Sequence, residues 1–373
     1  MRNPAPYNVI SAKVSDDKKS VELVFDKLVP GHVHELKCEG LRSATGKKLL
    51  NNTGWYTLNN IPGQKYSYTP KGKKQESAKP DKKQGALKLK SPTQTSKWEK
   101  GKKRLAVMKE ADKQSVDQSL PTQLTAKPKK KRRALVFYRC EGFVHSSISF
   151  GNYTLQKMGE LTGAFSVDLS DEYQDLSADN LAKYDLVVFN STTRLKMPEA
   201  QKKALLDFVK GGKGFVGIHA ASDNFADWQE GSEMIGGLFS GHPWLKNGGE
   251  WVFKNDAPEN VLNEAFHGQG FSCSDEIYCY KKPVDREKMS VLLSLDMSEE
   301  INQKPLASEK NKKKFPGVKV EDVDNPVSWY RSYGKGRMFY TNFGHNESTY
   351  SNAAIMKHLF DGLQYAAGDL VVD

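Results

Sequence analysis

The 373-residue sequence lacks any run of about 18 apolar residues, the length that crosses a membrane as a helix. It also lacks an apolar stretch of about 7–15 residues near its first methionine, so we expect no signal peptide and, from the residues alone, a cytoplasmic location. The four cysteines (Cys38, Cys140, Cys273 and Cys279) include no C-x-x-C pair, which argues against a zinc ribbon or a disulfide framework. We therefore expect cysteines outside disulfides, with a Cys273–Cys279 bridge as the alternative.

The positive charge is concentrated in one segment. Residues 63–133 hold 22 of the 56 basic residues but only 6 of the 45 acidic ones, so the rest of the chain is mildly acidic. Apolar residues are scattered here without a period, and such a segment cannot bury enough surface to offset its chain entropy. We predict a disordered Lys-rich linker, with a short helix near residues 97–112 as an alternative. Because aromatic residues are few in it, binding of nucleic acid through this linker is the least favoured function.

Residues 1–62 have the pattern of a small β unit. VELVF (21–25) and HELKCEG (34–40) alternate apolar and polar residues, as half-buried strands do, with a Pro30-Gly31 turn signal between them. NTGWYTLNNIP (52–62) adds an aromatic strand that ends at a proline. About 55 residues of short strands predict at most a small Ig-like unit.

Residues 134–373 predict a separate α/β domain. The apolar strands ALVFYR (134–139), FSVDLS (165–170), DLVVFNS (185–191) and GFVGIHA (214–220) alternate with helical patterns. This alternation is typical of a three-layer open sheet, mainly parallel and flavodoxin-like, with helices on both faces. A hairpin across Gly334-Lys335-Gly336 and a closing helix near residues 351–368 complete the predicted domain.

Polar residues that follow the strands form the candidate site, because ligands bind open α/β sheets at the carboxyl ends of their strands. His145, His219 and His345 each follow a predicted strand, and His242 lies in the glycine-containing stretch GLFSGHP. Glu276 begins the strand EIYCYKK, on the same face as Tyr278.

One of these residues stands in an unusual context. In GFVGIHAASD, Gly217 and Ala221 flank His219 at the spacing of a nucleophile elbow, but a histidine holds the place of the serine or cysteine. The pattern predicts a tight strand-to-helix turn that presents the imidazole.

Taken in order, several motifs resemble the ThuA-like, or trehalose-utilisation, family: GFVHSSI, GGKGFVGIHAASD, GGLFSGHP, DEIYCY and PVSWYRSYGKGRMFYTNFGHNESTY. The resemblance covers residues 134–373 and implies a class I glutamine amidotransferase-like fold and a role in carbohydrate use. The β unit, more loosely, looks like segments found beside such domains in large secreted proteins of planctomycete-type bacteria. That context implies a periplasmic or secreted protein, as the alternative to the cytoplasm.

The sequence differs from the amidotransferases at the nucleophile elbow. Their late His-x-Glu pair is present as His345-Asn346-Glu347, but His219 replaces the cysteine nucleophile. Imidazole does not replace a thiolate in forming a thioester, so glutaminase activity is not expected. Val144 also stands where the family's commoner GFRHxSI pattern has arginine, which puts any anion contact of that arginine in doubt.

These residues predict an enzyme that acts on a sugar or keto-sugar derivative by hydrolysis, elimination or isomerisation. His219 and His345 would be the acid–base pair or the ligands of a divalent metal such as zinc, and Glu347 would orient His345. The expected substrate-binding residues are His145, His242, Glu276, Tyr278 and Trp244. The alternative is a non-catalytic carbohydrate-binding module whose aromatic side chains stack on sugar rings.

Overall fold

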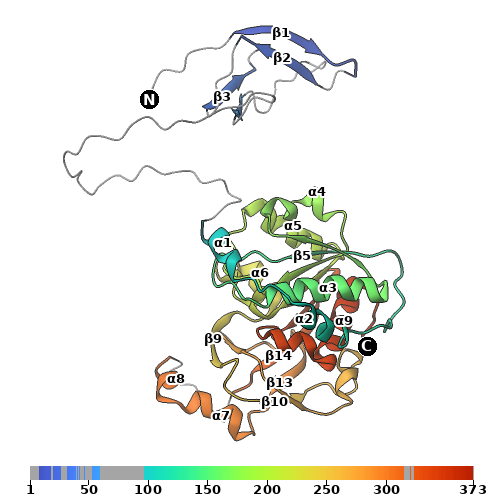
Figure 1. Ribbon diagram of the computed structural model, residues 1–373, viewed down its shortest axis with the longest axis vertical. Helices are drawn as coiled ribbons and strands as arrows, with labels where there is room; N and C mark the ends of the chain where they lie inside the picture. Colours follow the sequence, from blue (N-terminus) through green and yellow to red (C-terminus); the bar gives the residue numbers. More distant parts are fainter. Residues whose placement is uncertain are drawn as a thin grey trace, which may run out of the picture. The chain divides into compact units, whose positions relative to one another are not determined.

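The computed structural model describes residues 8–17, 20–26, 32–38, 40, 42, 46, 53–58, 96–314, 320 and 323–372. The chain divides into two compact units, Met1–Ala86 and Leu87–Asp373 (Figure 1). The predicted Pro30-Gly31 turn and residues 63–95 of the predicted linker lie outside the described residues.

The first unit contains two antiparallel strand pairs. β1 (Val9–Val14) pairs with β2 (Val21–Phe25), and β3 (His32–Lys37) pairs with β4 (Thr53–Leu58). A small N-terminal β unit is therefore present, as its alternating sequence pattern predicted.

The second unit is built around a nine-stranded mixed sheet in the order β11-β10-β13-β14-β15-β8-β7-β5-β6. Strands β15, β8, β7, β5 and β6 run parallel, and β14, β13, β10 and β11 extend the sheet antiparallel. The strand bounds are β5 (Arg133–Phe137), β6 (Ser166–Ser170), β7 (Leu186–Asn190), β8 (Gly214–Ile218), β10 (Trp251–Asn255), β11 (Phe271–Cys273), β13 (Ser290–Leu295), β14 (Pro326–Tyr333) and β15 (Gly336–Thr341). A separate pair joins β9 (Phe239–Trp244) to β12 (Ile277–Tyr280).

Helices cover both faces of the sheet. Successive strand residues point to opposite faces, so Val136 packs into one core with α3 and α9, whereas Phe137 packs into the other with α5 and α6. The helix bounds are α3 (Ile148–Thr162), α4 (Ala178–Leu181), α5 (Glu199–Lys210), α6 (Gln229–Ile235), α7 (Glu300–Ala307), α8 (Glu309–Lys314) and α9 (Ala353–Ala367). This arrangement confirms the predicted three-layer α/β fold.

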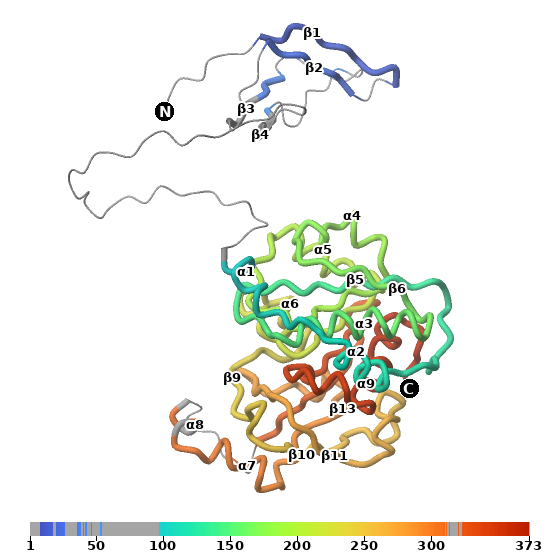
Figure 2. The backbone as a smooth tube through the Cα atoms, in the orientation of Figure 1, coloured from blue at the N-terminus to red at the C-terminus, as the bar shows by residue number. Residues whose placement is uncertain are grey.

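The prediction of a disordered linker is wrong for residues 96–132, which fold onto the α/β unit. They include α1 (Ser96–Gly101), the 3₁₀ turn η1 (Lys102–Arg104) and α2 (Glu110–Asp117). Trp98 and Val116 are fully buried, and α2 packs beside α3 (Figure 2). The alternative of a short helix near residues 97–112 is closer to the structure, although two short helices form in its place. Only a few isolated apolar side chains are buried here, and isolated side chains leave no periodic pattern in the sequence.

None of the four cysteines, all of which are described, forms a disulfide. Among the described residues, no helix is both long enough and apolar enough to cross a membrane.

Replacing Trp98 with alanine tests whether residues 96–132 belong to the folded unit. The variant loses a buried indole and its Nε1–H hydrogen bond to Asp171 Oδ2, which spans 2.7 Å. We expect the free energy of unfolding to fall by about 3–5 kcal/mol in urea titrations. The exposed Lys100 on the same helix supplies the control, K100A. A change below about 0.5 kcal/mol in W98A would show that the segment does not stabilise the unit.

His358 predicts a specific loss of stability in acid. It is fully buried in α9, with Nδ1 2.7 Å from the Leu262 carbonyl oxygen, and burial lowers its pKa to about 4. In the unfolded chain the pKa of a histidine is about 6.5. Between about pH 6.5 and pH 4, His358 is therefore protonated in the unfolded state but neutral in the folded state. This difference lowers the free energy of unfolding, on the order of 3 kcal/mol in all, as the pH falls through this window.

The substitution His358→Gln should therefore flatten the pH dependence of unfolding between about pH 6.5 and pH 4. Urea titrations at a series of pH values measure the slope. H267Q, at an exposed histidine, should keep the wild-type slope. Equal slopes for H358Q and the wild-type protein would show that His358 does not cause this loss.

Candidate functional site

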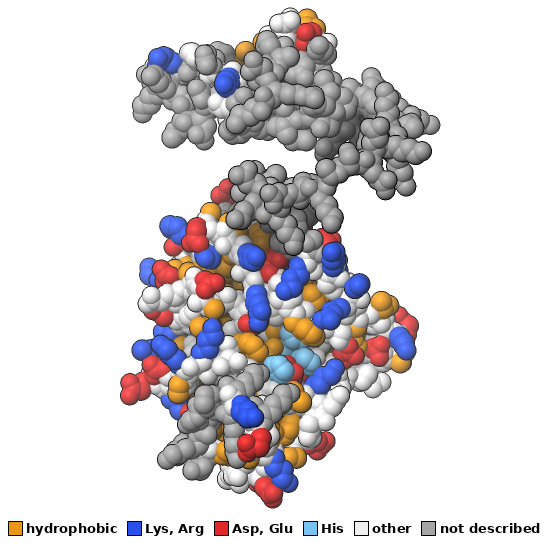
Figure 3. All heavy atoms as spheres, turned by 90° about the vertical axis from the view of Figure 1, so that its left-hand side faces the viewer, with side chains coloured by type: hydrophobic (Ala, Val, Ile, Leu, Met, Phe, Trp, Pro, Cys, Tyr) orange, Lys and Arg blue, Asp and Glu red, His pale blue; other side chains and the backbone are white. Residues whose placement is uncertain are grey.

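A cavity of about 700 Å³ opens where the carboxyl ends of β5, β8 and β15 meet. Histidine side chains are visible in this surface, with lysine and arginine side chains around them (Figure 3). The residues that line the cavity include Lys97, Arg104, Phe143, His145, Arg194, Asp223, His242, Glu276, Tyr278 and His345.

His219 occupies a tight turn, as the elbow pattern predicted. β8 ends at Ile218 and a 3₁₀ turn begins at His219, whose φ of +46° lies in the left-handed region that a non-glycine residue rarely adopts. Gly217 suits the turn, because a Cβ there would make tight contacts, 3.0 Å from Tyr340 Cδ2 and 3.2 Å from Ala221 Cβ. Tyr340 Oη donates a hydrogen bond of 2.7 Å to the His219 carbonyl oxygen and holds the strained backbone.

The hydrogen bonds of His219 indicate its tautomer. Nδ1 lies 2.8 Å from the carbonyl oxygen of Asn342 and 3.1 Å from the side-chain Nδ2 of the same residue. Because a carbonyl oxygen can only accept, we assign the proton to Nδ1. The other nitrogen, Nε2, then carries the lone pair, and it lies 3.2 Å from His345 Nδ1. A carbonyl that fixes the tautomer from behind is typical of histidines that bind a metal.

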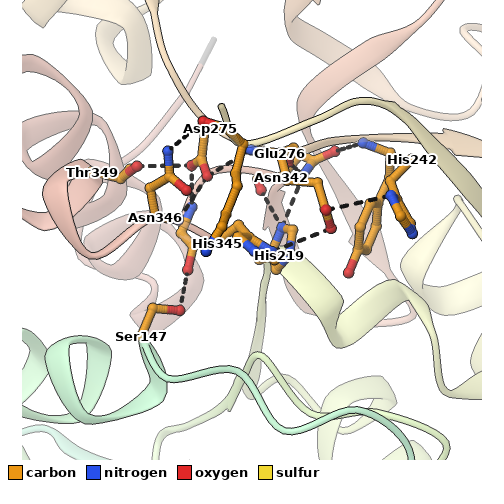
Figure 4. Close-up of polar contacts among 12 residues, drawn as sticks. Ser147, His219, His242, Asp275, Glu276, Asn342, His345, Asn346 and Thr349 are labelled. Atoms are coloured by element: carbon orange, nitrogen blue, oxygen red, sulfur yellow. Dashed lines mark hydrogen bonds and ion pairs between the residues drawn. The ribbon is translucent and has the colours of Figure 1, made fainter. Parts of the chain in front are cut away.

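Four groups converge at the base of the cavity. One ligand atom each from His145, His219, Glu276 and His345 lies within 4.8 Å of the other three. Glu276 Oε1 is 3.2 Å from His345 Nδ1, and Glu276 Oε2 is 3.4 Å from His242 Nδ1 at the mouth (Figure 4). The carboxylate therefore links the buried histidines to a histidine whose side chain is 41% exposed.

Burial keeps two of these histidines neutral. Desolvation, reinforced by His345 and His242, lowers the pKa of His145 to about 3, and burial lowers the pKa of His219 well below its usual value. His145 Nδ1 is buried without a hydrogen-bond partner among the described residues. The cluster thus holds uncharged nitrogens with available lone pairs next to one carboxylate.

A buried carboxylate holds the His345 loop. Asp275 Oδ1 accepts hydrogen bonds from the backbone N–H groups of Glu276 and Asn346, and Oδ2 accepts from Gly344 N–H and Thr349 Oγ1. All four distances are 2.8–2.9 Å. Burial raises the pKa of Asp275, and the four donors counter this by favouring the carboxylate. Asp275 thereby holds His345 and Glu276 in one geometry.

Asn342 is a second positioning residue. Besides receiving the His219 hydrogen bond on its carbonyl, its side chain accepts from Tyr278 N–H at 2.8 Å and donates to the Glu276 carbonyl at 3.2 Å. One residue at the end of β15 therefore connects the elbow to β12.

Six of the eight expected site residues line the cavity or lie at its base: His145, His219, His242, Glu276, Tyr278 and His345. Two do not. Glu347 is exposed on the turn after the loop, and Asp275 and Glu276 make the contacts expected of it. Trp244 is fully buried, and its Nε1–H donates to the Asn302 carbonyl at 2.8 Å, so its ring packs in the core and does not reach a ligand in the cavity.

Sequence reasoning missed Asp275, Asn342, Lys97 and Arg104. Asn342 had a signal, since it is the polar residue directly after β15. Glu276 is expected to begin a strand, but Asp275 and Glu276 both precede β12, and no sequence pattern marks the structural role of Asp275. Lys97 and Arg104 were assigned to the linker.

The model of the family described as trehalose utilisation, ThuA, matches residues 133–366. The chain belongs to the ThuA family. A solved ThuA-like protein from Bacteroides uniformis is 21% identical, with a TM-score of 0.50, over 65% of this chain and 95% of that one. Another, from Parabacteroides merdae, is 18% identical with a TM-score of 0.46, over 65% and 92% of the two chains. No curated protein matches the chain.

The four hydrogen bonds to Asp275 predict an effect on stability. Replacing Asp275 with asparagine puts an amide N–H₂ group against backbone donors, so two of the four hydrogen bonds are lost in a buried place. We expect the free energy of unfolding to fall by about 2–4 kcal/mol in urea titrations. E347Q, at an exposed carboxylate after the same loop, is the control and should change it by less than about 0.5 kcal/mol. An unchanged D275N would show that Asp275 does not hold the loop.

Proposed function

We propose that this ThuA protein is an enzyme that acts on a sugar or keto-sugar derivative at a divalent metal centre. The observation that carries the proposal is the convergence of His145, His219, Glu276 and His345 within 4.8 Å. Imidazole nitrogens with one carboxylate oxygen are the ligand set that zinc and similar ions prefer.

The donor atoms suit such an ion. His219 presents a neutral Nε2 because its Nδ1–H is donated to Asn342, and His145 Nδ1 is buried without a described partner. An uncompensated buried nitrogen costs free energy, and a bound ion would remove that cost. A divalent ion held by these four residues would polarise a carbonyl or hydroxyl oxygen of the substrate.

Other residues of the chain bind the substrate and move its protons. Tyr278 is part of the cavity wall and lies with its ring centroid 4.4 Å from that of His219, which keeps water from the buried side of the cluster. His242, on β9 at the mouth, contacts Glu276 and is exposed enough to exchange a proton with a bound sugar.

A metal-free acid–base pair is the second candidate. His345 Nδ1 and His219 Nε2 are 3.2 Å apart, within reach for passing one proton between two rings. The elbow does not support a glutaminase in either case. Cys140 does not replace the missing nucleophile, because burial raises the pKa of its thiol to about 12.

Metal content and turnover test the proposal together. The purified full-length protein, H219A, H345A and the exposed control H267A should be analysed for bound metal and assayed on a panel of glycosides and their keto derivatives. We expect about one divalent ion per chain in the wild-type protein and in H267A, and at least a tenfold loss of metal and turnover in H219A and H345A. Circular dichroism checks that each variant is folded.

The two candidates give different results. Turnover that survives chelation and metal removal but disappears in H219A and H345A would replace the metal centre with the acid–base pair. Full turnover in both variants would refute the placement of the site.

A further inference from the structure

The segment before the family-matched region is part of the cavity wall. The family model begins at residue 133, yet Lys97 on α1 and Arg104 on η1 line the cavity. Asp171 ties this segment down, since its Oδ2 accepts from Trp98 Nε1 at 2.7 Å and pairs with Lys102 Nζ at 2.6 Å. The backbone N–H of Ala106 donates to the Ser146 carbonyl at 3.2 Å, beside His145.

The segment also fits closely against the loop that carries His145. A Cβ on Gly101 would lie 2.5 Å from Val144 Cγ2, so a larger residue there would displace the Val144 side chain. Trp98 packs with Val144 and Ile148 in a small buried core of its own. The guanidinium of Arg104 lies 4.8 Å from the centroid of the Phe143 ring, and this stacking holds it at the mouth.

Among the residues that line the cavity, basic side chains outnumber acidic ones. Of the acidic side chains there, Asp223 pairs with Arg194 at 3.4 Å, and Glu276 is engaged by His345 and His242. Lys97 and Arg104 have no acidic partner among the described residues, although both line the same cavity. Two uncompensated cations at the mouth favour a ligand with a negative group at that end.

We propose that the substrate is an anionic sugar, whose carboxylate or phosphate group binds Lys97 and Arg104 while its ring reaches the histidine and Glu276 cluster. The sugar ring in this statement rests on the proposed function, but the anion site does not. Guanidinium groups suit both anions because they offer paired N–H donors, and Arg104 is already oriented by Phe143.

Calorimetric titration of the full chain tests this with three probes that differ in charge: D-glucose, D-glucuronate and D-glucose 6-phosphate. We expect at least one anionic probe to bind about tenfold more tightly than glucose, a difference of about 1.4 kcal/mol, and to weaken as salt rises. R104A and K97A should each weaken that probe about three- to tenfold and leave glucose unchanged. K103A, an exposed lysine on η1 outside the cavity lining, should change binding less than twofold.

The three probes distinguish a carboxylate site from a phosphate site, and the results show which of the two proposals fails. Preference for glucuronate identifies a carboxylate site, and preference for glucose 6-phosphate identifies a phosphate site. The inference is overturned if neither anionic probe binds more tightly than glucose, if neither binds up to about 10 mM, or if K103A acts like R104A. Arg104-dependent binding without metal or turnover would refute only the proposed function, whereas turnover confined to neutral sugars and insensitive to R104A would refute only this inference.

Discussion

The four hydrogen bonds to the buried carboxylate of Asp275 are the constraint on which the site depends. Three of them join two segments that are about 70 residues apart in sequence, the residues just before β12 and the loop after β15. Together with the contacts of Asn342, they place Glu276 and His345 next to each other. A buried acceptor with four donors is costly to disturb, so this arrangement resists change.

Desolvation then sets the chemistry of the cluster. The same burial that lowers the pKa of His145 and His219 keeps both rings neutral across the physiological range. Backbone contacts decide which nitrogen of His219 faces inward, and the strained φ of that residue aims the ring. In a nucleophile elbow, a tight turn after a strand presents a nucleophilic side chain. Here the same kind of turn presents the imidazole nitrogen of His219.

Part of the cavity wall comes from the segment that precedes β5. Residues 96–106 contribute Lys97 and Arg104, while His145, His219 and His345 follow strands of the sheet and His242 and Glu276 belong to the β9–β12 region. The segment that carries Lys97 and Arg104 lies outside residues 133–366, which the family model matches, whereas the four histidines and Glu276 lie within them.

The sequence by itself determined the α/β fold, because strand and helix periodicities are local properties of neighbouring residues, as in DLVVFNS and the helix after Pro198. It also predicted that His145, His219 and His345 lie close together, since polar residues after buried strands meet at one sheet edge, and the structure brings these three residues, His242 and Glu276 to one cavity. Only the tertiary structure decided that Asp275 and not Glu347 positions the His345 loop, that Trp244 lies in the core, and that residues 96–132 are folded. Those outcomes depend on contacts between residues far apart in the chain, and such contacts leave no periodic signal in the segments that make them.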